Sequence, residues 1–489
     1  MPALLLAMLA FSMIQTSVVP ILPSLAREFD VTGAEIAWLV TANLLSAAVL
    51  TPVLGRVGDT RGRKPVLLVA LGGLVAGSAL AVATHSLPLL ILARVLQGTA
   101  GGVLPLAIGV VRDAVPGARA AGGVALISAA LGVGSGLGLV LTGLLLQLWS
   151  YESIFWVGLA LGLLAVAAVI ALVPSDPPRD RTGGADPVGA VLLAAWLSSL
   201  LIAISQGNGW GWTSAPTVGL FVAAVLLAGV WVAVERRVAH PLVDLAMMSR
   251  PGVAVSNAAG VLIGFGMYGS FMVISNFVQT PAPVGYGFGA SVLSAGLLLL
   301  PSAAGSLIAA PVGAAVLARR GPRTPLVLGG VLASLSMTYL FLQHAREADV
   351  LAASAVFGLG VGLAFAAMPA FINSEVPPAH SGSANGINAV LRTVGGATGT
   401  AVLSAVLTND TIPGVGLPGA DAYRLTFLIT AAACLVAAAV PVVLRLTTPS
   451  RPRAGSAGAP KTVSSAPNPP GRSQPPTPVG AGDHPAPPH

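Results

Sequence analysis

The chain has 489 residues, of which 55% are hydrophobic and 8% are charged, with a formal net charge of +7 and a mean hydropathy of +0.87. A soluble domain carries about 25% charged residues because its surface faces water. The composition therefore excludes an ordinary soluble protein. One cysteine, Cys434, excludes a disulfide framework and a Cys/His metal site, so neither a metal nor a cofactor is expected.

Long apolar segments recur along the whole chain. A hydrocarbon core about 30 Å thick needs roughly 20 apolar residues of helix, and backbone in lipid must satisfy its polar groups within the segment. The sequence therefore predicts an all-α polytopic membrane protein with fourteen spans. In chain order they are expected at 3–24, 35–55, 66–84, 87–111, 121–147, 153–173, 188–206, 214–234, 252–278, 289–317, 325–343, 350–373, 382–407 and 424–446.

The basic residues indicate the orientation of these spans. With a cytoplasmic N-terminus, the loops after the even-numbered spans and the tail hold 19 of the 24 Lys and Arg residues, and the opposite loops hold three. Cytoplasmic loops carry such an excess. Both termini are therefore predicted to be cytoplasmic, in the cell inner (plasma) membrane. The positive charge has a topological origin, and a nucleic-acid partner is not expected.

An internal repeat divides the chain. Pro52–Gly55 precedes a basic loop after the second span, and Pro311–Gly313 precedes another basic loop after the tenth, at an offset of about 258 residues. Transporters are often built from such repeats, with the substrate site between them. The predicted domains are an N-terminal six-helix half (1–174), a linker with two inserted helices (175–250), a C-terminal six-helix half (251–446) and a disordered Pro-rich cytoplasmic tail (447–489).

The segment from Gly55 to Lys64 combines glycines, Asp59 and several basic residues. Its glycines allow close packing and a tight turn. Asp59 can accept hydrogen bonds from a helix N-terminus or pair with a cation, and Arg112 at the end of the fourth span is the expected partner. The alternative is a turn with orientation-setting charges and no further role.

Further motifs point to one family. Leu92–Gly98 contains an R-x-x-Q-G pattern, Glu235–Asp244 follows the eighth span, and Leu391–Ala397 lies in the thirteenth. Together with Gly55–Lys64 they closely resemble the major facilitator superfamily, in its fourteen-helix drug:proton antiporter branch (EmrB/QacA type). The resemblance implies a major facilitator fold and export of hydrophobic or amphipathic molecules in exchange for protons. The implied gate and coupling residues are Gly55, Asp59, Arg63, Arg94, Gln97, Gly98 and Arg112.

The chain also departs from that branch. Gln15 stands in the first span where the branch usually has Asp, and Leu139 stands where a proline is usual in the fifth. All seventeen Asp and Glu residues are expected in loops, at helix ends or in the tail. Arg94 and Arg392 are charges inside spans, where a cation is costly unless it faces a polar cavity. The titrating groups are therefore expected among Asp59, Glu35, Glu152, Asp410 and Asp421.

The expected substrate cavity is lined by polar residues inside the spans: Gln15, Asn43, Asn257, Asn276 and Arg392. Plain interhelical hydrogen bonding is the alternative role for the amides, and structural anchoring for the arginines. The expected partners are a small-molecule substrate, protons and the lipid bilayer, with the chain working as a monomer.

No phosphate-binding G-x-x-x-x-G-K-[ST] loop and no catalytic triad occurs, so catalytic residues are not predicted and the chain is not expected to be an enzyme. One alternative function is a facilitator or exporter of a specific anionic or neutral metabolite without proton antiport. A membrane-embedded enzyme and a non-transporting receptor or scaffold are the others.

Overall fold

The computed structural model describes residues 1–115, 118–174, 186–239, 241–377, 380–412 and 417–447. This part of the chain is helical, and fourteen of its helical segments are long and apolar enough to cross a membrane. The fourteen predicted spans and the all-α fold class are thus confirmed. The predicted Pro-rich tail lies outside the described residues beyond Thr447.

The spans form two groups of six and an inserted pair. The N-terminal six are α1 (Pro2–Ser17), α4 (Trp38–Arg61), α5 (Arg63–Ala83), α6 (Leu87–Gly98) continued by η2 (Thr99–Gly102) and α7 (Val103–Ala114), α8 (Ala118–Leu148) and α9 (Glu152–Leu172). The inserted pair is α10 (Pro187–Trp210) and α11 (Ala215–Glu235). The C-terminal six are α13 (Pro251–Gln279), α14 (Val292–Arg320), α15 (Arg323–Leu342), α16 (Glu347–Glu375), α17 (Ser381–Asn409) and α18 (Ala420–Thr447).

Short helices occupy the connections. These are η1 (Val19–Ile21), α2 (Leu22–Glu28), α3 (Gly33–Ile36), α12 (Leu245–Met248) and η3 (Ala282–Val284). They leave the spans joined by brief links, which keeps consecutive spans antiparallel. Each six-helix half is therefore a bundle of alternating direction.

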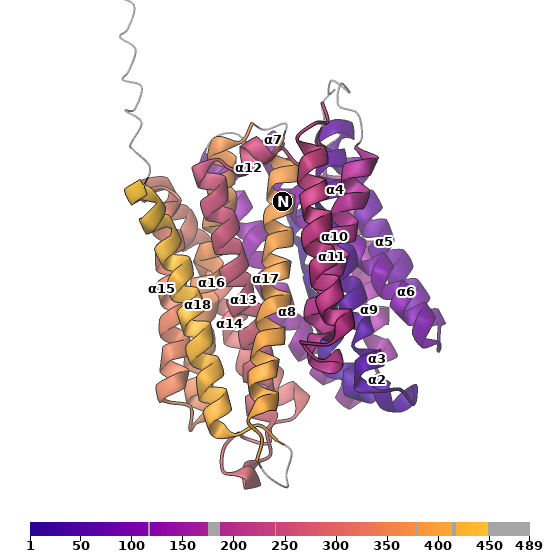
Figure 1. Ribbon diagram of the computed structural model, residues 1–489, viewed down its shortest axis with the longest axis vertical. Coiled ribbons are helices and arrows are strands. Elements are labelled where there is room, and N and C mark those ends of the chain that lie inside the picture. Colours follow the sequence, from indigo (N-terminus) through magenta and orange to yellow (C-terminus); the bar gives the residue numbers. More distant parts are fainter. Residues whose placement is uncertain (116–117, 175–185, 240, 378–379, 413–416, 448–489) are drawn as a thin grey trace, which may run out of the picture. The chain divides into compact units, whose positions relative to one another are not determined.

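The two halves lie side by side, as Figure 1 shows with the first half in indigo and the second in orange and yellow. They meet along two seams, one where α8 packs on α14 and one where α4 packs on α17. The inserted helix α10 packs on both α4 and α17, so it covers the second seam. The inserted pair is thus attached to both halves.

Glycines explain how the helices of the first seam come so close. A Cβ on Gly136 would lie 2.9 Å from Ala303 Cβ, and one on Gly143 would lie 2.4 Å from Leu293 Cα, both on α14. Gly134 and Gly138 instead face α1, where a Cβ on Gly138 would lie 2.5 Å from Thr16 Oγ1. The alternating glycines of α8 therefore let it touch a helix of its own half and a helix of the other, as small-residue spacing allows.

Two equivalent turns support the internal repeat. Gly62 separates α4 from α5 with φ +107°, and Gly321 separates α14 from α15 with φ +74°. Only glycine adopts such a backbone without strain. α4 also continues six residues past its expected end, so residues 55–61 form its last two turns rather than a loop. Asp59 is therefore held on a helix.

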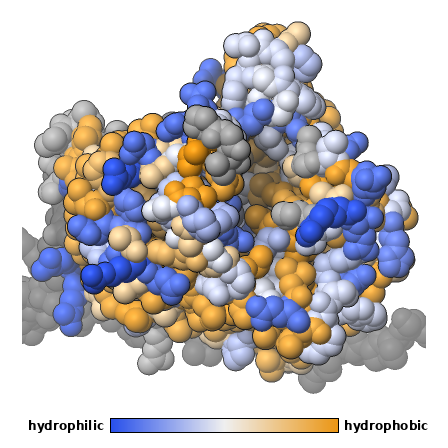
Figure 2. All heavy atoms as spheres, turned by 90° about the horizontal axis from the view of Figure 1, so that it is seen from below, coloured by the Kyte–Doolittle hydropathy of each residue, from blue (hydrophilic) through white to orange (hydrophobic). Residues whose placement is uncertain are grey.

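The two ends of the bundle differ in charge. We call the end where α4 joins α5 the basic end, because it contains Arg56, Arg61, Arg319, Arg320 and Arg323. The opposite end is the one where α8 joins α9. Figure 2 looks onto the opposite end, where hydrophilic residues are scattered among hydrophobic ones.

Gly358 tests the close packing of α14 on α16. A Cβ there would lie 1.9 Å from Ser302 O, so Gly358→Ala should lower the free energy of unfolding by about 1–3 kcal/mol through overpacking. Gly72 on α5 has no atom within 4 Å of its would-be Cβ and is the matched control. In thermal unfolding in detergent, the midpoint of Gly72→Ala should equal that of the parent or lie slightly above it. Equal midpoints for both variants would contradict this packing.

Candidate functional site: a latch at the basic end and a central cavity

Asp59 and Arg63 form a buried ion pair at the basic end. Arg63 Nη2 lies 3.0 Å from Asp59 Oδ1, and the two side chains are 2% and 0% exposed. Gly109 O accepts from Arg63 Nη1 at 2.7 Å, and Asp113 Oδ2 lies 2.5 Å from the same nitrogen. A buried guanidinium needs such partners because desolvation is costly. Arg63 thus ties the ends of α4, α5 and α7 together.

The same pair reaches into the other half. Asp59 Oδ2 accepts the Ser383 N–H at 3.1 Å, in the first turn of α17, and Arg63 Nη2 donates to Ser381 Oγ at 3.2 Å. A carboxylate at a helix N-terminus is stabilised by the free N–H groups there. The sequence-based prediction that Asp59 accepts from a helix N-terminus is confirmed. We call the contacts of Asp59 and Arg63 with α17 the latch.

Glycine makes the latch possible. A Cβ on Gly55 would lie 2.6 Å from Gly382 O, and one on Gly382 would lie 2.7 Å from Asp59 Oδ1. Side chains at these two positions would therefore force α4 and α17 apart. Gly55 has the packing role expected from its motif, and Gly382 is a further residue that the motif did not indicate.

Arg112 is not the partner of Asp59, and that pairing was wrong. The Arg112 guanidinium donates through Nη1 to Asn373 Oδ1 on α16 at 3.0 Å. Arg63 takes the place beside Asp59 because the turn at Gly62 folds it back onto the last turn of α4. Arg112 nevertheless bridges the two halves at the same end, as does Arg56, whose Nη1 lies 3.2 Å from His380 Nδ1.

Arg94 lies inside the first half and is 1% exposed. It donates through Nε to Leu39 O at 3.0 Å and through Nη1 to Gln97 Oε1 at 2.8 Å. Gln97 in turn donates to Ser78 Oγ at 3.1 Å, and Asn43 donates to the Arg94 carbonyl at 3.0 Å. This network joins α4, α5 and α6 and leaves the guanidinium turned away from the other half.

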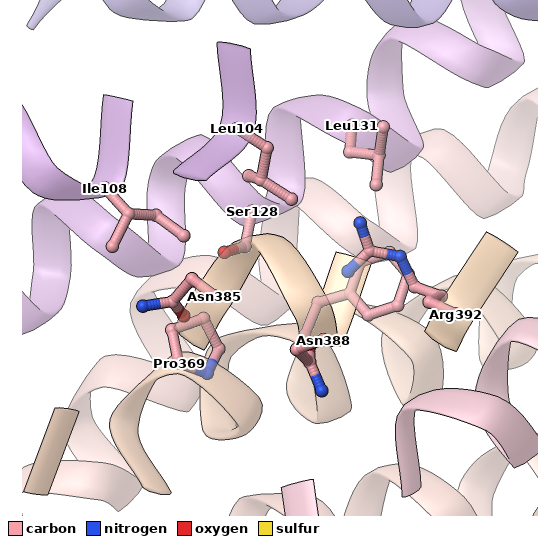
Figure 3. Close-up of a pocket in the computed structure, with 9 residues that line it drawn as sticks. Leu104, Ile108, Ser128, Leu131, Pro369, Asn385, Asn388 and Arg392 are labelled. Atoms are coloured by element: carbon pink, nitrogen blue, oxygen red, sulfur yellow. The ribbon is translucent and has the colours of Figure 1, made fainter. Parts of the chain in front are cut away.

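Two small cavities lie between the halves, with volumes of about 10 and 20 Å³. Figure 3 shows the first, where Leu104, Ile108, Ser128 and Leu131 of the first half face Pro369, Asn385, Asn388 and Arg392 of the second. Cavities of this size hold little more than one water molecule. The two cavities are thus too small for a drug-sized molecule, and the latch is closed.

Arg392 is the charged residue that lines both cavities. Its guanidinium carbon lies 4.7 Å from the centre of the Phe365 ring, a cation–π geometry. Among the described residues, no carboxylate forms an ion pair with it. Gln15 and Tyr268 line the second cavity with Arg392, and the Gln15 side chain faces the Tyr268 hydroxyl. Arg392 therefore gives the cavity a positive charge that an incoming group can meet.

The structure places the other expected cavity residues in different surroundings. Asn257 accepts a hydrogen bond from Asn388 Nδ2 at 3.2 Å, beside the first cavity. Asn43 instead donates to the backbone carbonyl of Arg94. Asn276 is exposed and lines neither cavity. Tyr268 was missed, and its signal in the sequence was a tyrosine in the middle of a long apolar helix.

The described carboxylates lie at or near helix ends, as expected. Glu35 precedes α4, where hydrogen bonds from the Thr32 N–H and hydroxyl hold the pKa of its carboxyl below the usual range. A carboxyl with a lowered pKa stays ionised near neutral pH. Glu35 is therefore a poor proton carrier, which narrows the expected set of titrating groups.

Comparison with known proteins identifies the class to which these features belong. The family model described as Major Facilitator Superfamily matches residues 4–400 and 258–478. Two six-helix halves, a central cavity and a latch between the halves define a membrane transporter rather than an enzyme. The chain belongs to the Major Facilitator Superfamily.

Its relatives include drug-export members of that family. The tetracenomycin C resistance and export protein of Streptomyces glaucescens is 27% identical over 390 residues, covering 79% of this chain and 71% of the relative. The multidrug efflux pump LfrA of Mycolicibacterium smegmatis is 29% identical over 392 residues, covering 79% and 76%. The predicted resemblance to the drug-efflux branch is confirmed.

A solved structure shares the fold. The human organic anion transporter MFSD10 (TETRAN) superposes with a TM-score of 0.63 at 15% identity, covering 90% of this chain and 98% of that one. At this identity the likeness concerns the fold alone.

Asp59→Asn should weaken the latch, because a charge-assisted hydrogen bond worth roughly 1.5–3 kcal/mol is lost. Transport should fall strongly while insertion is retained. In addition, a cysteine at Ala389, which lines the second cavity, should become more reactive to a polar maleimide added from the basic end.

Asp113→Asn is the matched control. Asp113 also contacts Arg63 but lies within the first half and is 26% exposed. Its replacement should leave the Ala389→Cys labelling rate near that of the parent. Normal transport and unchanged labelling in Asp59→Asn would show that these residues only set the orientation of the chain.

Proposed function

We propose that this transporter exports hydrophobic or amphipathic small molecules, drugs among them, by alternating access driven by the proton gradient. The protein works as a monomer in the cell inner membrane with both termini cytoplasmic. The basic end is then the cytoplasmic end, as the distribution of Lys and Arg favours. The drug-export names of its relatives support the substrate class.

The closed latch is the observation that carries this proposal. At the basic end, polar contacts of Asp59, Arg63 and Arg112 join the two halves. Rocking of one half against the other needs contacts that can break at one end at a time. Opening of the latch would connect the central cavities to the cytoplasm.

A second candidate is export or facilitated passage of an anionic or neutral metabolite without proton antiport. Arg392 favours it, because this guanidinium lines the cavities and has no ion-pair partner among the described carboxylates. A cation entering this low-dielectric site would be repelled, and an anion would be attracted. The charge of the preferred substrate therefore distinguishes the two candidate functions.

Dye efflux from vesicles with an imposed pH gradient tests the charge preference. The parent should export a neutral or anionic probe faster than a matched permanently cationic one. Arg392→Ala should reduce that preference, and Gln15→Asp should improve efflux of the cation, since Gln15 lines the same cavity. Vigorous export of the cation by the parent, unchanged in Arg392→Ala, would contradict this view of the cavity.

The orientation is tested by labelling single cysteines in intact cells. Cys434 is buried, so Cys434→Ser provides a background without other reactive thiols. Thr213 follows α10 at the opposite end, and Ser249 follows α12 at the basic end; both are exposed. An impermeant maleimide should label Thr213→Cys from outside and leave Ser249→Cys unlabelled until the cells are opened. The reverse pattern would overturn the orientation.

A further inference from the structure

The inserted helices contain two neighbouring carboxylates at the basic end, of which Glu235 is buried and Asp186 half-buried. Asp186 caps α10, and its Oδ1 accepts the Gly189 N–H at 2.7 Å. Glu235 ends α11, is 3% exposed, and accepts the Val243 N–H through Oε2 at 3.4 Å. The remaining oxygens, Asp186 Oδ2 and Glu235 Oε1, are buried and accept no hydrogen bond from the described residues.

Gly189 shows how near these two oxygens lie to each other. A Cβ built on Gly189 would be 2.3 Å from Asp186 Oδ2 and 2.9 Å from Glu235 Oε1. The two oxygens are therefore separated by no more than the sum of these distances. Any side chain at this position would occupy the space beside the carboxylates.

The surroundings supply no described cation to the pair. Arg236 and Arg237 follow Glu235 directly, but neither forms an ion pair with it in the described part of the chain. Asp244, a further acidic residue of this region, caps α12. The indole Nε1 of Trp231 is buried and faces Glu235 one turn earlier on α11.

The helices packed against this region contribute apolar side chains. α4 provides Ala48 and α17 provides Val390 to the cluster that also contains Trp231 and Leu242. From α10, the titratable group that faces Glu235 is Asp186. Within the described part of the chain, the groups around Glu235 are therefore apolar side chains, a buried indole, backbone N–H groups and Asp186.

Burial and the neighbouring negative charge of Asp186 each oppose ionisation of Glu235. A proton on Glu235 removes one of the two negative charges from this region. We propose that Glu235, facing Asp186, is a proton-binding site that titrates during the transport cycle. This inference rests on the proton coupling of the proposed function and locates its titrating group.

The place of the pair in the fold gives its protonation a mechanical consequence. Glu235 also accepts from the backbone of the segment leading to α12 and α13, and α10 packs on both α4 and α17. Loss of the proton from Glu235 adds a negative charge where the inserted helices join the second half. The charge state of the pair therefore affects how the α10–α11 hairpin packs over the seam between the halves.

The transport test uses the full-length chain in proteoliposomes with the neutral dye Nile red as the probe, because Arg392 disfavours a permanent cation in the cavity. In the parent, a pH gradient should accelerate Nile red transport. Glu235→Gln should lose that acceleration and retain exchange of labelled for unlabelled Nile red without a gradient. Asp244 is a half-buried carboxylate at the same end, and asparagine can take over its helix-capping role. Asp244→Asn should therefore behave like the parent. Full acceleration in Glu235→Gln would overturn the proton site and leave the proposed function standing.

Infrared difference spectra give a readout independent of transport. A protonated-carboxyl band that titrates in the purified parent should be absent from Glu235→Gln. It should titrate at lower pH in Asp186→Asn, which lacks the neighbouring negative charge, and be retained in Asp244→Asn. Added Na⁺ at constant pH should leave the band unchanged. A band that survives Glu235→Gln, or one displaced by Na⁺, would overturn the site. A parent without gradient-driven transport would contradict the proton coupling in the proposed function, and the spectra would still decide whether the pair binds a proton.

Discussion

The guanidinium of Arg63 has almost no access to water, and the helices at the basic end of the bundle supply its hydrogen-bond and ion-pair partners. Asp59 neutralises it, Gly109 and Asp113 accept from or pair with its Nη1 within the first half, and Ser381 of the second half accepts from its Nη2. Burying a charge without partners is costly. The contacts that Asp59 and Arg63 make with α17 are the part of this arrangement that joins the two halves, so the closed state depends on them.

This dependence suits a transporter that must open and close. Hydrogen bonds to charged groups contribute roughly 1.5–3 kcal/mol each, which is comparable with the 1–3 kcal/mol by which one ligand typically alters the binding of another. In the function that we propose, a latch of a few such bonds would hold the closed state and would open when substrate binds or a protonation state changes. The glycine seam of α8 and α14 supplies the permanent packing about which the halves can rock.

The sequence predicted those features that depend on local pattern. Apolar runs of the right length gave the fourteen helices, and the motif around Asp59 indicated a contact with a helix N-terminus, because glycines, acid and bases lie within ten residues of each other. Features that depend on tertiary contact were missed. Arg63 replaces Arg112 beside Asp59 because of the turn at Gly62, and Asn276 is exposed although its helix lines the centre. Glu235 and Asp186 lie 49 residues apart in the chain and meet through the pairing of α10 with α11.

The most direct test of the latch is the distance between the halves at the basic end. Spin labels on Arg61→Cys at the end of α4 and Ser374→Cys near the end of α16, two exposed positions, in a Cys434→Ser background report that distance by pulsed electron paramagnetic resonance. With Asp59 intact, one short-distance population should dominate in the absence of substrate. Asp59→Asn should add a population at longer distance. An unchanged distance distribution in Asp59→Asn would contradict the claim that Asp59 and Arg63 hold the two halves together.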